Sequence, residues 1–131
     1  MYTLISNNDF KNNPTFITPW SLIHFLIGFV GIINSNYFNI DKEVSLIFLL
    51  LIHTLYEFKD YYFSYVYNGP EHTFSKWSSS NSIFNILGDT AIFILGMALA
   101  INVNVNKFEL IMINILLLIV IIFFFTDKNL S

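Results

Sequence analysis

Long apolar blocks separated by short polar segments dominate the chain. Four such blocks run from Phe16 to Ile33, Val44 to Tyr62, Ser82 to Ile101 and Phe108 to Phe125. Each is close to the roughly 20 residues that a helix needs to cross a hydrocarbon core. Strands are a poor alternative, because four strands cannot close into a barrel in lipid. The pattern predicts an all-α membrane protein, a four-transmembrane-helix bundle forming a single domain over residues 1–131.

The segments between the blocks are polar and differ in length. Residues 34–42 and 102–107 are short, and the second alternates Asn and Val, as expected of a tight helical hairpin. Residues 64–80 are longer and contain Asn68-Gly69-Pro70, which is a turn signal. Three serines then lead into the third block and predict a helix start.

Composition strengthens the membrane prediction and excludes other classes. The chain is 55% hydrophobic, 18% aromatic and only 11% charged, whereas a soluble domain carries roughly 25% charged residues. It has no cysteine, which excludes disulfides and thiolate metal sites. It also has no arginine and a net charge of -3. Without a clustered basic face, no nucleic-acid partner is expected, and the lipid bilayer is the predicted environment.

The few lysines favour one orientation of the four spans. An even number of spans places both termini and the 64–80 segment on the same side. That side carries Lys11, Lys59, Lys76 and Lys128, and the other carries Lys42 and Lys107. Since positive charge accumulates on the cytoplasmic side, the termini are predicted to be cytoplasmic.

Three of the predicted spans group several ionisable or amide side chains, which cost about 2.5–3.5 kcal/mol each for charged groups at a span centre, whereas the fourth has only Asn114 as a mid-span polar group. The grouped side chains are His24 in the first span, His53, Glu57 and Asp60 in the second, and Asn81, Asn85 and Asp89 at the start of the third. In the second span the spacing of four and three residues puts all of them on one helix face. Small residues on the first and third spans allow close helix contact.

Depth in the membrane predicts that these groups meet. The end of the second span lies level with the start of the third, which places Glu57 near Asn85 and His53 at the depth of Asp89. His24 lies about eight residues into the first span, or ~12 Å at 1.5 Å per residue. All of these groups fall in the leaflet nearest the termini, so a single polar site is predicted there.

The residue types in this site allow several chemistries. Glu57, Asp89 and His53 are the candidate catalytic residues, and His24, Asp60, Asn81 and Asn85 the candidate binding residues. His24, His53, Glu57 and Asp89 could hold a divalent metal such as zinc. General acid–base work or a proton path are alternatives. Alternatively, these side chains have only a structural role, in which polar contacts between helices, worth about 1 kcal/mol each, fix the packing.

Three functions remain open at this stage. The first is binding or processing of a lipid-linked or amphiphilic small molecule in a pocket between the first three spans. The second is a small transporter or a proton or cation channel subunit, which would have to form an oligomer because four short spans enclose little volume. The third is a non-catalytic membrane scaffold. No H-E-x-x-H, P-loop, G-x-S-x-G or potassium-filter motif occurs.

The segment from His53 to Ala100 resembles a known pattern. It reads H-x-x-x-Y-E-x-x-D-Y-Y and later N-S-x-x-N-x-x-G-D-T. This resembles a family of small uncharacterised bacterial membrane proteins, in which a W-E-x-x-E-N helix precedes a D-S-x-x-N-S-x-x-D helix. More distantly it is similar to VanZ-like proteins, which are associated with resistance to the glycopeptide teicoplanin.

The resemblance covers two of the four spans and implies where a site lies. Tyr56 and Glu57 take the place of the Trp-Glu pair, and Asn85 and Asp89 match the family's Asn and final Asp. The chain departs from the pattern at Asn81, where the family has Asp, and lacks the arginine of the preceding loop. The resemblance implies no defined activity.

Overall fold

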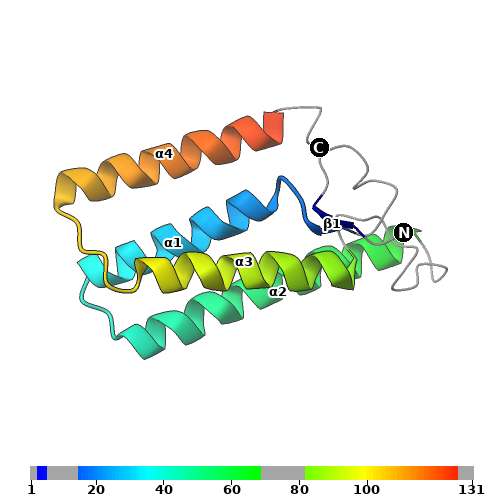
Figure 1. Cartoon of the computed structure of the whole chain (residues 1–131), viewed down its shortest axis with the longest axis horizontal. Coiled ribbons are helices and arrows are strands. Elements are labelled where there is room, and N and C mark those ends of the chain that lie inside the picture. Colours follow the sequence, from blue (N-terminus) through cyan, green and yellow to red (C-terminus); the bar gives the residue numbers. More distant parts are fainter. Residues whose placement is uncertain (1–2, 6–14, 69–81, 127–131) are drawn as a thin grey trace.

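The computed structural model describes residues 3–5, 15–68 and 82–126, and most of them are helical. Two short strands, β1 (Thr3–Ile5) and β2 (Thr15–Ile17), pair in parallel. The four helices are α1 (Ser21–Tyr37), α2 (Lys42–Asn68), α3 (Ile83–Ala100) and α4 (Lys107–Thr126). They run roughly along one axis, and β1 lies at the end of the bundle where α4 finishes (Figure 1). The prediction of an all-α chain with four helices is confirmed.

The start of the first helix differs from the prediction. Phe16 belongs to β2, and α1 begins only at Ser21. Pro19 explains the difference, because a proline disfavours helical geometry in the residue before it, here Thr18. The turn at 18–20 is instead closed by the Ser21 amide, which donates to the Thr18 carbonyl at 3.0 Å. The predicted polar segment 34–42 is shorter than expected, since α1 continues to Tyr37.

The two tight connections are shaped by asparagine and acidic caps. After α1, Asn39 takes a positive φ of 54°, a conformation that asparagine tolerates better than most residues. Asp41 then caps α2 by accepting the amides of Glu43 and Val44 at 2.9 and 3.1 Å. Before α4, Asn106 and Glu109 bond each other's amides in a capping box.

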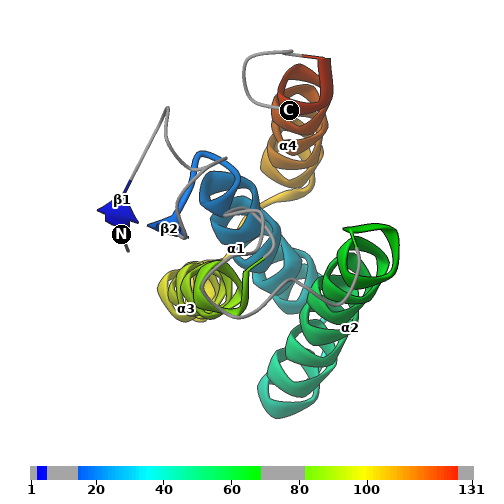
Figure 2. The ribbon, with the colours of Figure 1, turned by 90° about the vertical axis from the view of Figure 1, so that its right-hand side faces the viewer.

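Helix α1 lies at the centre of the bundle, with α2, α3 and α4 around it (Figure 2). Its closest partner is α3, and two glycines make that approach possible. A Cβ atom at Gly28 would lie 2.5 Å from the Phe93 carbonyl oxygen, and one at Gly96 only 2.2 Å from that of Phe25. This contact continues into an apolar core that includes Ile32, Ile33, Phe93, Met97, Ala100 and Leu110.

Helix α4 packs loosely against the others. Of its residues only Leu110 and Phe124 are buried, while its apolar side chains face outward around most of the helix. Among the helices described, α3 and α4 are long and apolar enough to cross a bilayer by length and composition. Such a helix surface is unfavourable in water and suits lipid.

Candidate functional site

Two histidines and a glutamate from α1 and α2 converge near the end of the bundle that carries β2. The Nδ1 atom of His24 lies 3.3 Å from Oε1 of Glu57. The Nδ1 atom of His53, one turn before Glu57 on α2, lies 4.0 Å from the same oxygen. One ligand-type atom from each of the three residues lies within 4.8 Å of the others. The i,i+4 spacing on α2 places His53 and Glu57 on the face that meets α1.

A second carboxylate approaches the outer edge of His24. The Nε2 atom of His24 lies 3.5 Å from Oδ2 of Asp89 on α3. The other Asp89 oxygen accepts a hydrogen bond from the Ser21 hydroxyl at the start of α1. The Ser21 oxygen also accepts the Thr18 amide at 3.0 Å. The turn before α1 therefore fixes Asp89, and Asp89 in turn faces His24.

His53 is oriented by its own contacts with α3. Its Nε2 atom lies 3.2 Å from the Thr90 hydroxyl, and its ring stacks on Phe93 with centroids 4.3 Å apart. The His24 ring meets the His53 ring edge-on at 5.2 Å. Both imidazoles thus present Nδ1 toward Glu57 and have Nε2 directed at an oxygen of α3.

Glu57 is the least satisfied of these groups. Its side chain is buried, with 7% of the residue exposed. Its Oε1 atom has no hydrogen-bond partner, although His24 Nδ1 is close by. Buried carboxylate oxygens are ordinarily paired or hydrogen-bonded, because removing them from water is costly. Oε1 of Glu57 is therefore a buried acceptor that lies close to two imidazoles without accepting a hydrogen bond from either.

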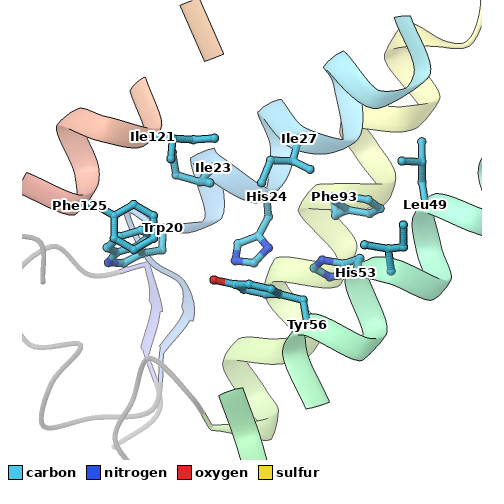
Figure 3. A pocket seen from close by; sticks show the side chains of 11 residues that line it. Trp20, Ile23, His24, Ile27, Leu49, His53, Tyr56, Phe93, Ile121 and Phe125 are labelled. Atoms are coloured by element: carbon cyan, nitrogen blue, oxygen red, sulfur yellow. The ribbon is translucent and has the colours of Figure 1, made fainter. Parts of the chain in front are cut away.

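A cavity of about 390 Å³ opens beside the histidines. Its walls are mostly apolar and include Ile23, Ile27, Ile52 and Phe125. The His24 and His53 rings and Tyr56 gather at one wall, and Trp20 and Phe125 lie across from them (Figure 3). A volume of this size, with a few polar groups on apolar walls, is typical of a small-molecule site.

The predicted binding residues are divided between this site and other places. His24 lies at its centre. Asp60 instead pairs with Lys59 at 2.9 Å on the partly exposed side of α2. Asn85 is buried, and its side-chain amide nitrogen donates to the Phe16 carbonyl at 3.3 Å. This hydrogen bond connects β2 to α3. Asn81 and the three serines at 78–80 lie outside the described residues, while the helix predicted after them begins at Ile83 with Ser82 as its cap.

Two residues of the site, Ser21 and Thr90, were not predicted from the sequence. Each is a hydroxyl residue in an apolar region, and such residues occur in membrane helices without any role in a site. The signal that could have found Thr90 is its position beside Asp89, at the depth expected for His53. Ser21 carried no comparable signal, because the helix was predicted to begin five residues earlier.

Comparison of the chain with protein-family models, with curated proteins and with solved structures gave no match.

Proposed function

We propose that the protein is a multi-pass membrane protein that binds an amphiphilic small molecule in the cavity beside His24 and His53. The apolar part of the ligand lies against the walls formed by α1, α2 and α4, and its polar group lies at the histidines. The observation that carries the proposal is the position of two imidazoles at one wall of a mostly apolar cavity, with the buried Glu57 carboxylate 3.3 Å from the Nδ1 atom of His24.

The outward-facing surface supports four spans. In α2 the exposed side chains include Ile47, Phe48, Leu51 and Leu55, which would face water if this chain stood alone in solution. The 17 residues of α1 extend about 26 Å at ~1.5 Å per residue, close to the hydrocarbon thickness. The longer α2 reaches beyond it, where Lys59 and Asp60 are exposed to polar surroundings. Cytoplasmic termini follow from the lysine distribution.

A channel or transporter is less well supported by the arrangement of polar groups. Asn34 and Asn114 form a second polar contact between α1 and α4 farther along the bundle. Between that contact and His24 lies the apolar core with Ile32 and Phe93. A polar path through these residues would have to cross this layer.

The proposal is tested by filling the cavity. The protein is reconstituted in nanodiscs, and binding of a fluorescent fatty-acyl amphiphile is measured by titration. Ile27→Trp places an indole on a wall of the cavity and is expected to weaken binding by roughly tenfold or more. Ile119→Trp, an exposed apolar position on α4 outside the cavity wall, is the matched control and should bind as the wild type does. Equal affinities of the two variants would refute a ligand in this cavity.

A further inference from the structure

The three converging atoms of His24, His53 and Glu57 have the chemistry of a metal site. Neutral imidazole nitrogens and a carboxylate oxygen are ligands that zinc prefers, and two imidazoles with one carboxylate form the donor set of many catalytic zinc sites. The three residues come from α1 and α2, which contact each other and both pack against α3. The chain has no cysteine to offer a competing thiolate site.

The spacing of these atoms fits tetrahedral coordination. Ligand atoms bound at about 2.0–2.1 Å to zinc in a tetrahedron lie about 3.3–3.4 Å from each other. His24 Nδ1 and Glu57 Oε1 are already 3.3 Å apart. His53 Nδ1 lies 4.0 Å from the same oxygen, and one ligand atom from each of the three residues lies within 4.8 Å of the others, so the His53 imidazole has to move closer to the other two ligands when the ion binds.

The buried oxygen without a hydrogen bond is an independent indication of a cation. Glu57 Oε1 has no hydrogen-bond partner, and it is the atom on which both Nδ1 atoms converge. A divalent ion among these three atoms would supply the missing partner and neutralise the carboxylate. A structural helix-to-helix contact would be expected to use that oxygen in a hydrogen bond instead.

The groups behind the histidines complete the pattern. Imidazoles that bind a metal through one nitrogen nearly always donate the other N–H to a carboxylate, hydroxyl, carbonyl or water. Here Asp89 stands behind His24 Nε2 and Thr90 behind His53 Nε2. This arrangement selects the tautomer with a free lone pair on Nδ1. Asp89 is thus a positioning residue and not a ligand.

We infer that His24, His53 and Glu57 bind one zinc ion, that Asp89 and Thr90 orient the two imidazoles, and that the fourth coordination position opens toward the apolar cavity. Zinc held in this way can polarise a carbonyl or phosphoryl oxygen of a bound molecule. The zinc site does not depend on an amphiphile in the cavity, because its three protein ligands all belong to the chain and water can take the fourth position.

The test is metal binding by the full-length protein in detergent micelles. The purified protein is stripped with a chelator, titrated with Zn²⁺ alone and analysed for bound metal by mass spectrometry. The wild type is expected to retain about one zinc ion per chain, and E57Q and H53N to retain almost none. The matched control is D60N, which removes the nearby, partly exposed carboxylate of the Lys59–Asp60 pair and should bind zinc as the wild type does.

The positioning role of Asp89 has its own readout. D89N should still take up zinc at saturation but with an affinity lower by roughly 10- to 100-fold, as found for groups behind metal-bound histidines. A structural role alone would leave the affinity of the folded fraction unchanged. Zinc binding by E57Q equal to that of the wild type, or none by the wild type, would overturn the site.

Should E57Q fail to fold by circular dichroism, Co²⁺ substitution of the wild-type protein decides the question. A four-coordinate cobalt ion with nitrogen and oxygen ligands gives intense visible absorption bands, which support the site. Weak bands of a hydrated six-coordinate ion, or no bands, would contradict it. Failure of amphiphile binding in I27W leaves these metal measurements unaffected, so the two proposals fail separately.

Discussion

The His24 Nδ1 atom on α1 and the Glu57 Oε1 atom on α2 lie 3.3 Å apart without forming a hydrogen bond. Each side chain is oriented by other contacts, His24 by Asp89 and Glu57 by its position one turn after His53. The protein thus keeps a buried carboxylate oxygen without its usual compensation, although an amide would be cheaper to bury. Sites of this kind trade stability for a function.

That trade predicts opposite effects of one substitution with and without metal. Without zinc, E57Q is expected to raise the stability by about 1 kcal/mol, since it replaces a buried carboxyl group whose Oε1 atom has no hydrogen-bond partner. With zinc at about 100 times its dissociation constant, the wild type should gain about 2.7 kcal/mol and E57Q nothing. Thermal unfolding in micelles, with chelator or with zinc, measures both effects.

D60N is the control for this prediction, because Asp60 is partly exposed and paired with Lys59. Its unfolding should respond to zinc as that of the wild type does. An E57Q variant that is less stable than the wild type under chelation would show that the Glu57 carboxylate stabilises the apoprotein.

The Ser21 hydroxyl connects the turn before α1 to Asp89 on α3. It accepts the Thr18 amide and donates to the carboxylate. Ser21→Ala is expected to lower the free energy of unfolding by about 1–3 kcal/mol, because two buried groups lose their partner. Chemical denaturation followed by circular dichroism measures the loss.

Ser35→Ala is the matched substitution on the same helix. The Ser35 hydroxyl donates a hydrogen bond to the Gly31 carbonyl within α1, and that carbonyl is already an acceptor in the backbone hydrogen bonding of the helix. Its replacement should change stability by no more than about 0.5 kcal/mol. Equal losses in the two variants would mean that Ser21 has no special role.

The close contact of α1 with α3 at Gly96 predicts sensitivity to any larger residue. A Cβ atom there would lie 2.2 Å from the Phe25 carbonyl oxygen, and backbone atoms cannot yield without separating the helices. Gly96→Val should cost about 1–3 kcal/mol or more. Ala98→Val, on the exposed face of α3, adds the same kind of side chain away from the contact and should be nearly neutral. Comparable unfolding curves for both variants would contradict the packing.

Much of the fold could be predicted from the sequence, because each helix overlaps one apolar block, although α2 continues to Asn68, into the segment predicted as a connection. The i,i+4 spacing of His53 and Glu57 required a shared helix face. The antiparallel order of the second and third helices placed His53 level with Asp89, and the structure puts His53 against Thr90, the next residue. The spacing of residues on a helix face and their depth along a span both follow directly from residue numbers, so they can be predicted from the sequence.

The partners of individual side chains were not accessible in this way. Asn85 shares a helix stripe with Asp89, yet it bonds the backbone of β2. That strand was predicted as helix, so its carbonyl groups were assumed to be satisfied within a helix. The parallel pairing of residues 3–5 with 15–17 is too short to leave an alternating pattern. Asp60 was predicted to belong to the site, but it lies near the polar end of α2, where its side chain is partly exposed.

A reciprocal pair of amides connects α1 with α4. Asn34 and Asn114 each donate to the other's side-chain oxygen, at 3.2 and 3.1 Å. Replacing both with Leu, singly and together, should give a coupling energy of about 0.6–1.7 kcal/mol, the range found for hydrogen bonds between membrane helices. The four unfolding free energies of this double-mutant cycle measure it. A coupling near zero would show that the surrounding apolar contacts alone hold α4 to α1.

The absence of cysteine from the chain allows a clean test of the four proposed spans. Ile40→Cys and Asn104→Cys introduce single thiols at the connections after α1 and after α3, which lie at the same end of the bundle (Figure 1). Lys59→Cys lies toward the other end, on the exposed side of α2. With cytoplasmic termini, a membrane-impermeant maleimide should label the first two in intact cells and the third only after permeabilisation. Labelling of Asn104→Cys but not Ile40→Cys would mean that α3 and α4 cross the bilayer without α1 and α2. Labelling of Lys59→Cys alone would reverse the orientation while leaving the four spans in place.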